Sequence, residues 1–402
     1  MRASVALRSF LVLACASAIA CTGILGSFEV ADGTTTTDGA VTPNGETGPG
    51  PGPGPGGEDG SVNLPDGAMC EAPKVACGTA CVDVKTDAKN CGKCGQDCGG
   101  STCDMGNCKP QKLYEVTGEE IISLDPGPTE VIFTAGLAVR SCPKTGCTGA
   151  PKIIGNPTGT VFRVRAVGNA AVFTVGANKY GEAIYVCPLT GCPATPTPFQ
   201  TDANSFFETL STNGNELAYS SGGLTIQVMR CNNGTCSINT TTNRKSNGGR
   251  FVLGAAHVYG VANSSPNPPI FRCAIGVTPC VPETILTSVA GLENITSMAF
   301  SGGNLFFANG GRISSCDGNT CGATVKTLTS AGAMVTDLTA TIGHLYWLKA
   351  GSNTIEHCPL PACNNVASIP LPPGGGVPTA LRADDKFLYW ADKGTLWRVL
   401  QP

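Results

Sequence analysis

The chain has 402 residues and a net charge of −3, and only 14% of its residues are charged. No basic field exists to hold nucleic acid, so nucleic-acid partners are not expected. Its 53 glycines and 29 prolines exceed what a helical protein would contain. Its 22 cysteines indicate an oxidising compartment, because cytosolic thiols are kept reduced.

The first 21 residues have the layout of a secretory signal. Arg2 and Arg8 precede an apolar stretch that is too short to span a bilayer and that ends in small residues. The sequence Ala-Ile-Ala-Cys at 18–21 resembles a bacterial lipobox, in which the cysteine thiol receives a diacylglyceryl group and the chain is cleaved before it. We therefore predict a lipoprotein-type signal peptide over residues 1–21, with lipid attached at Cys21.

The anchor has alternatives. The match is imperfect, because the lipobox family prefers leucine where Ala18 stands. Cys15 is a weaker alternative site for the lipid, because it follows a shorter apolar run. The third alternative is an ordinary cleaved signal peptide in which Cys21 is present by chance. Thr22 follows the cysteine, and in Gram-negative lipoproteins that resemblance favours the outer membrane over the inner membrane. We expect an exported chain anchored by lipid to the outer membrane or cell surface, with simple secretion or a periplasmic location as the alternative.

Residues 22–66 predict a disordered linker. They hold almost no large apolar side chains, and the stretch "TTTTDGAVTPNGETGPGPGPGPGGEDG" at 34–60 cannot build a core. Its alternating glycine and proline should stay extended and hold the rest of the chain away from a membrane.

Residues 67–110 predict a small disulfide-rich module. A segment of this size buries too little surface to fold without cross-links. The pair Cys91 and Cys94 has the spacing of a zinc or redox motif, but the segment has no histidine and its cysteine count is even, so we expect four disulfides and no metal. The pairing cannot be deduced, because eight cysteines allow 105 connectivities. The cysteines are Cys70, Cys77, Cys81, Cys91, Cys94, Cys98, Cys103 and Cys108.

This segment resembles a known family. The sequences "CVDVKTDAKNCGKCGQDC" at 81–98 and "CDMGNC" at 103–108 are similar to the stigma-specific cysteine-rich module, which recurs in secreted lipoproteins of some Gram-negative soil bacteria. The resemblance implies an extracellular interaction module and brings no catalytic residue with it.

The remaining cysteines, which follow residue 110, fall into six pairs that form a repeat. The first cysteines of successive pairs are 45, 44, 42, 43 and 42 residues apart. Each pair is flanked by short β-rich runs bounded by glycine, asparagine or proline, which predict four strands per unit of roughly 43 residues, the pattern of a β-propeller blade. The pairs are Cys142/Cys147, Cys187/Cys192, Cys231/Cys236, Cys273/Cys280, Cys316/Cys321 and Cys358/Cys363.

The blade count follows from the chain ends. The stretch "KFLYWADKGTLWRVL" at 386–400 repeats the second and third strands a seventh time, and Val399 stands where a cysteine would be. The run "KLYEVTG" at 112–118 resembles a fourth strand without a blade of its own. We therefore expect residues 111–402 to form an all-β, seven-bladed propeller closed by residues 112–118, because an open ring would leave unpaired sheet edges. A six-bladed ring is the alternative.

The repeated cysteines are expected to be structural. The first cysteine should end the third strand and the second should begin the fourth, so that the thiols face each other across a turn. Closing so short a loop should stabilise each blade by only about 2 kcal/mol. We expect these disulfides to hold exposed hairpin tips on an outer rim with little core.

No catalytic constellation is found. The three histidines, His257, His344 and His357, stand at repeat positions that accept varied residues, and we assign them solvated or packing roles, with His257 and His344 apart. No nucleophile elbow, zinc-protease motif or phosphate loop is present, and no cofactor or metal is expected. No cluster of carboxylates or bases of the kind that a propeller enzyme might show comes from matched blade positions.

Propeller ligands usually bind over the central channel, on the face made by the loops between strands two and three and between blades. The polar candidates in those loops are Lys179, Tyr180, Asn263, Asn309, Lys349 and Asp392.

The sequence thus favours a non-enzymatic envelope lipoprotein whose propeller binds a protein or glycan. Resemblance to bacterial lipoproteins that join the same module to CPxxGC-type propeller repeats supports this interpretation. An envelope lyase or hydrolase with a site over the channel, and a purely structural envelope component, are the alternatives. The oligomeric state and the ligand are left open.

Overall fold

A computed structural model describes residues 70–402, except 177–181, 202–206, 208, 222–224, 233–234, 243–245, 263–267 and 288–294. The predicted signal peptide with Cys21, and the predicted linker 22–66, lie outside the described residues. Among those described, no helix is both long enough and apolar enough to cross a bilayer.

The cysteine-rich module contains two small hairpins and four disulfides. Of residues 70–108, only Cys91 and Cys98 are buried hydrophobic side chains, so cross-links replace a core. The disulfides are Cys70–Cys81, Cys77–Cys94, Cys91–Cys103 and Cys98–Cys108. The hairpin strands are β1 (Val75–Cys77), β2 (Ala80–Val82), β3 (Cys103–Asp104) and β4 (Asn107–Cys108).

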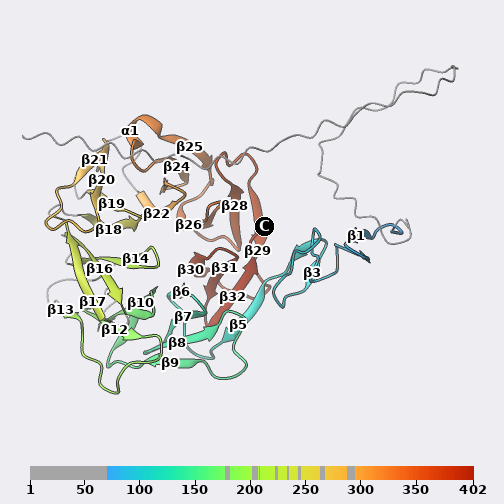
Figure 1. Ribbon diagram of the computed structural model, residues 1–402, viewed down its shortest axis with the longest axis horizontal. Coiled ribbons are helices and arrows are strands. Elements are labelled where there is room, and N and C mark those ends of the chain that lie inside the picture. The colour runs from blue at the N-terminus through green and yellow to red at the C-terminus, as the bar shows by residue number, and fades with distance from the viewer. Residues whose placement is uncertain are drawn as a thin grey trace, which may run out of the picture. The chain divides into compact units, whose positions relative to one another are not determined.

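The rest of the described chain folds into seven four-stranded antiparallel sheets, the blades of a β-propeller, whose innermost strands surround a common centre (Figure 1). This confirms the seven-bladed prediction, and the six-bladed alternative was wrong. Blade 1 consists of β6 (Leu124–Pro126), β7 (Glu130–Ala135), β8 (Ala138–Pro143) and β9 (Lys152–Gly155). Blade 2 consists of β10 (Thr160–Val167), β11 (Ala170–Gly176), β12 (Ala183–Pro188) and β13 (Gln200–Thr201).

The next three blades follow in the same order from the centre outward. Blade 3 consists of β14 (Leu210–Thr212), β15 (Glu216–Ser221), β16 (Thr225–Asn232) and β17 (Thr235–Thr241). Blade 4 consists of β18 (Ser246–Leu253), β19 (His257–Ala262), β20 (Ile270–Ala274) and β21 (Glu283–Leu286). Blade 5 consists of β22 (Ile295–Ser301), β23 (Asn304–Asn309), β24 (Arg312–Asp317) and β25 (Lys326–Ser330), with the short helix α1 (Cys321–Thr324) before β25.

The last two blades complete the ring. Blade 6 consists of β26 (Val335–Ala340), β27 (His344–Lys349), β28 (Thr354–Pro359) and β29 (Ala367–Pro370). Blade 7 takes three strands from the end of the chain and its outermost strand from the beginning of the propeller, as predicted, with Leu396 opposite Tyr114. Its strands are β30 (Pro378–Ala383), β31 (Phe387–Asp392), β32 (Thr395–Leu400) and β5 (Gln111–Glu115).

The core lies between neighbouring blades. Seven apolar clusters are described, one at each junction, and each packs the second strands of two adjacent blades against each other. Phe133, Phe173, Phe307, Trp347 and Trp390 lie on the second strands and are fully buried. The apolar runs in the sequence are therefore buried on both sheet faces, which explains why they do not alternate strictly with polar residues.

All six cysteine pairs of the repeat form disulfides. The expectation that the second cysteine begins the fourth strand was wrong except at Cys236. In the other blades the second cysteine lies in the connection between strands three and four, at Cys147, Cys192, Cys280, Cys321 and Cys363.

The expected exposed rim was also wrong. The first cysteines are buried, and every pair belongs to or packs against one of the apolar clusters between blades. In three blades the backbone N–H of the second cysteine donates to the outermost strand of the preceding blade. These bonds run from Cys147 to the Leu113 carbonyl at 3.1 Å, from Cys192 to Ile154 at 2.6 Å and from Cys280 to Thr241 at 2.9 Å. In these blades the cysteine loop therefore links its own blade to the preceding one.

Candidate functional site

Three of the predicted ligand-face residues lie in the described chain, and they occupy equivalent positions. Asn309, Lys349 and Asp392 each end the second strand of a blade and pair with the first residue of the innermost strand. The other three candidates, Lys179, Tyr180 and Asn263, lie outside the described residues.

Two of these three residues are already engaged by their neighbours. Lys349 forms an ion pair with Glu356. Asp392 is buried and accepts a hydrogen bond from the Gly376 amide, while its Oδ2 atom has no hydrogen-bond partner among the described residues. Asn309 differs, since it lines a surface cavity of about 830 Å³ together with Arg250 and Arg312. Of the three, Asn309 is the one positioned to meet a ligand.

The histidines lie away from the described lining of the central channel. His257 and His344 begin the second strands of blades 4 and 6, at the strand end opposite to Asn309. The ring of His344 lies 5.7 Å from the ring of His357, between centroids, and Tyr346 packs on both. Burial lowers the pKa of His357, and His344 beside it lowers that pKa further. The side chains of His344, Tyr346 and His357 therefore pack together in blade 6.

A second cavity, of about 630 Å³, runs along the centre of the propeller and is lined by the innermost strands of all seven blades. The ionisable side chains among its described lining residues are four arginines and two aspartates, which leaves two positive charges in excess. They are Arg163, Arg165, Arg250, Arg382, Asp125 and Asp337.

Strand register arranges these six residues in two levels. Arg163 and Asp337 pair with Thr174 and Leu348, which hold the same position on the second strands of blades 2 and 6, and Arg250 holds the matching place in blade 4. We call Arg163, Arg250 and Asp337 the first charged layer.

The second charged layer consists of Asp125, Arg165 and Arg382. These residues pair with Ile132, Val172 and Tyr389, which are again equivalent between blades. In blade 2 the two layers lie two residues apart, at Arg163 and Arg165, which places them about 6.6 Å apart along the strand.

Both carboxylates of the cavity have partners. Asp337 accepts hydrogen bonds from the Leu381 amide at 3.0 Å and from Arg382 at 3.1 Å. Asp125 accepts from the Ala166 amide at 2.9 Å, and its other oxygen lies 3.9 Å from Arg382. Each aspartate therefore ties its own blade to the next one, and both are used by the same arginine.

The other arginines of the cavity lack a carboxylate partner within the described chain. Arg165 is only 6% exposed and donates to carbonyl oxygens, among them Leu210 at 3.0 Å, and to the Ser123 hydroxyl at 3.3 Å. Burial lowers its pKa to about 9, and repulsion from Arg382 contributes. Arg163 donates to the Phe162 carbonyl at 3.2 Å, and burial lowers its pKa too. The described ionisable side chains at the centre of the propeller thus carry a net positive charge.

Sequence reasoning missed this cavity, in which matched positions of the innermost strands hold arginines and aspartates. The predicted ligand-face residues were all placed in loops, whereas the charged side chains of the cavity lie on the innermost strands. The available signal was "TVFRVRAV" at 160–167, where Arg163 and Arg165 interrupt an otherwise apolar strand.

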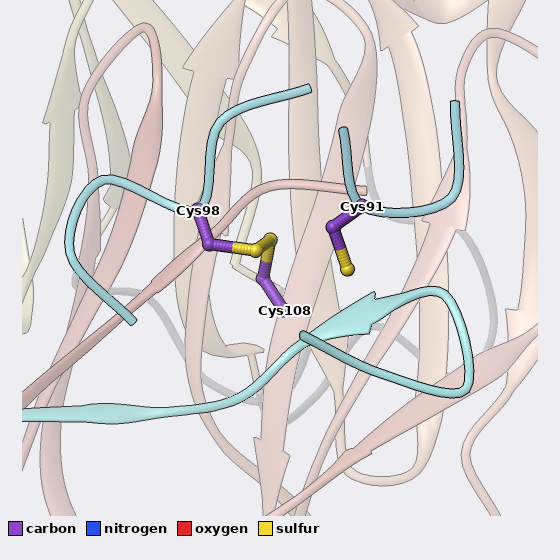
Figure 2. Close-up of side chains that lie close together, drawn as sticks. All are labelled: Cys91, Cys98 and Cys108. Carbon is purple, nitrogen blue, oxygen red and sulfur yellow. A yellow bond between two sulfur atoms is a disulfide. The ribbon is translucent and has the colours of Figure 1, made fainter. Parts of the chain in front are cut away.

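The module offers one cluster with the composition of a metal site. The sulfur atoms of Cys91, Cys98 and Cys108 lie within 4.8 Å of one another. Figure 2 shows the bond that joins Cys98 to Cys108, and Cys91 is bonded to Cys103. With their sulfurs joined in disulfides, these cysteines present no thiolate to a metal.

The fold is shared with solved propellers. Streptogramin B lyase is 15% identical with a TM-score of 0.54, and the match covers 73% of this chain and 97% of that one. An inactive variant of virginiamycin B lyase from Staphylococcus aureus, solved with quinupristin, is 15% identical with a TM-score of 0.53, covering 73% and 99%. The computationally designed protein Ika8 is 14% identical with a TM-score of 0.50, covering 72% and 100%.

At these identities the likeness concerns the fold alone. No family model matches the chain, and no curated protein is similar to it in sequence. The resemblance of the module to stigma-specific proteins therefore stays a prediction.

Proposed function

We propose that the protein is a non-enzymatic binding scaffold of the cell envelope whose ligand enters the central channel. The observation that carries this proposal is the cavity of about 630 Å³ to which all seven blades contribute. Its described ionisable groups are suited to holding a charged ligand, and its two carboxylates are occupied by backbone amides and Arg382.

The cellular location is argued from the cysteines. Ten disulfides indicate an extracellular or periplasmic location. We propose in addition that Cys21 carries a lipid anchor and that the module is an extracellular interaction module of the stigma-specific type. Growth with labelled palmitate tests the anchor. Label should enter the wild type and the Cys15→Ser variant and should be absent from Cys21→Ser, whereas label in Cys21→Ser contradicts the anchor.

Retention on isolated cell-wall and surface-polysaccharide fractions tests the binding function. Ser297 lines the cavity from β22, so Ser297→Trp should fill the channel and abolish retention of the exported protein. Thr327→Trp, on the exposed outermost strand of the same blade, is the matched control and should be retained like the wild type. Equal retention of the Ser297→Trp variant, or none of the wild type, contradicts the proposal.

One observation favours the alternative, an envelope lyase or hydrolase. Burial raises the pKa of the Asp125 carboxyl, as acid–base catalysis requires. If this group were catalytic, Asp125→Asn would abolish turnover of a substrate bound in the channel while leaving its binding intact. A binding scaffold has no turnover to lose, and the same substitution should lower its stability, because Asp125 links blades 1, 2 and 7.

A further inference from the structure

We propose that the central channel recognises a dianion, such as a dicarboxylate, through the arginines of the two charged layers. This rests on the proposed function, which places the ligand in the channel. Arg163 and Arg165 are two residues apart on one extended strand, so their side chains lie on the same face of it and their Cα atoms are about 6.6 Å apart. The same chemistry occurs in small free dicarboxylates and in the acidic ends of surface polysaccharides, and the experiment distinguishes these sources.

The first layer supplies free donors. A guanidinium carries five N–H groups in a planar fork that matches an oxyanion in two-point contact. Among the contacts of the described residues, Arg163 uses its fork for a single hydrogen bond, to the carbonyl of its neighbour Phe162. Arg250, across the ring in blade 4, lines the channel with no described hydrogen bond or ion pair. The layer's aspartate, Asp337, accepts hydrogen bonds from Arg382 and two backbone amides, and its charge is shared between Arg382 and Arg163.

The second charged layer adds the positive charges of Arg165 and Arg382. Arg165 is buried and its hydrogen bonds end on neutral oxygens, so its positive charge is compensated only in part. Arg382 shares Asp125 and Asp337 with the backbone. Like charges so close repel one another, and the low dielectric around them strengthens both that repulsion and the attraction for an anion. A bound anion would offset the repulsion between these arginines, and binding of the anion would therefore stabilise the cluster.

Positively charged side chains also lie where the channel meets the surface. Arg250 borders both the central cavity and the surface cavity beside it, which Arg312 and Asn309 also line. Clefts lined by one sign of charge concentrate counter-ions and raise their association rate. An anionic ligand would therefore meet Arg312 and Arg250 at the surface before it reaches the layers, and a ligand longer than a free dicarboxylate would stay in contact with both.

Isothermal titration of the exported protein in low salt tests the inference with glutarate and digalacturonate as probes. Glutaramide, which has the length of glutarate without its charge, is the control ligand. We expect at least one dianion to bind and glutaramide not to bind. Arg163→Gln and Arg250→Gln should each weaken binding at least tenfold, and Lys326→Gln, which removes an exposed charge from outermost strand β25, should leave it unchanged. Digalacturonate binding much more tightly than glutarate identifies a polysaccharide end, and the reverse identifies a free dicarboxylate.

Two results overturn the inference: no probe binds the wild type, or both glutamine variants bind as the wild type does. If the glutamine variants fail to fold, Arg163→Lys and Arg250→Lys keep the charge and lose the fork. Thermal unfolding with and without the dianion should then show a smaller stabilisation than in the wild type, and an equal one overturns the inference. Envelope retention that is lost in Ser297→Trp but unaffected by every dianion overturns the anion inference and leaves the proposed function standing.

Discussion

In the cysteine-rich module four disulfides join residues that are 10–17 positions apart, whereas in the propeller six disulfides each close a loop of 5 or 7 positions. The module has two buried apolar side chains, both cysteines, and the propeller has an apolar cluster at each blade junction. The cross-links therefore replace a core in one region and join an existing core in the other. Disulfide density alone does not tell what a disulfide does; the surface buried around it does.

The largest expected effect comes from separating the two regions. A chain that begins at Lys109 lacks the module but keeps β5, and it should retain a cooperatively folded propeller. A chain that begins at Gly118 also lacks β5, so it exposes the edge of β32 and removes Leu113 from the core between blades 7 and 1. We expect the second chain to aggregate or unfold.

Circular dichroism, thermal melts and gel filtration of the two truncated chains measure this difference. The wild-type chain is the reference for both. Similar behaviour of the two truncations would mean that ring closure does not depend on β5.

Removal of one disulfide from each region should give the next largest effect. Cys98→Ser/Cys108→Ser removes a buried bond of the module, which should cost about 2–5 kcal/mol and unfold a segment without another core. Cys142→Ser/Cys147→Ser should lower the stability of the propeller by about 2 kcal/mol and leave it folded, because Leu113 and the apolar cluster remain.

Limited proteolysis reports the state of the module, and urea unfolding reports the state of the propeller. The two double variants serve as controls for each other. A module that still resists protease without the Cys98–Cys108 bond, or a propeller that unfolds without the Cys142–Cys147 bond, reverses the comparison.

The sequence predicted the ring because its repeat is made of core and turn positions. The similarity between Leu388-Tyr389-Trp390 and Leu345-Tyr346-Trp347 showed the seventh blade, since both triplets fill the same place in the core. The run beginning at Lys112 lacked a blade of its own, and antiparallel sheets leave one place for it. These inferences need only local patterns and their spacing.

The charged layers could not be predicted in this way. Their positions are equivalent in the fold but hold different residues, as Arg163, Ser297 and Asp337 show, so they do not register as a repeat. Closure of the ring brings Asp125 close to Arg382, which is more than half the chain away. The burial of the cysteine loops was missed for a similar reason, because the strand that covers each loop belongs to the preceding blade.

A smaller effect is expected where module and propeller meet. Arg398 is 2% exposed, donates to the Gly99 carbonyl in the module and to the Gln111 side chain, and lies 4.3 Å above the ring of Phe387. Arg398→Met keeps the apolar contact and loses the hydrogen bonds, which should cost roughly 1–3 kcal/mol. Protease should cut the module faster in this variant, with little change in the propeller's melting temperature. Arg312→Met, on an exposed strand end, is the control, and equal cleavage of the two variants contradicts the coupling.

The smallest effect is a dependence on pH that one region has and the other lacks. Burial and the neighbouring His344 hold the pKa of His357 below its usual range, so the folded propeller binds this proton less readily than the unfolded chain. The stability of the propeller should therefore fall as the pH drops below about 6.5, the ordinary value for histidine, and stop falling once the pH passes the lowered pKa. The module has no histidine and should be unaffected in that range. Urea midpoints at pH 7.5 and 5.5 measure the difference. His357→Gln should reduce the change more than His257→Gln does, because the His257 ring is less buried. An unchanged pH dependence in His357→Gln would place the sensitive group elsewhere.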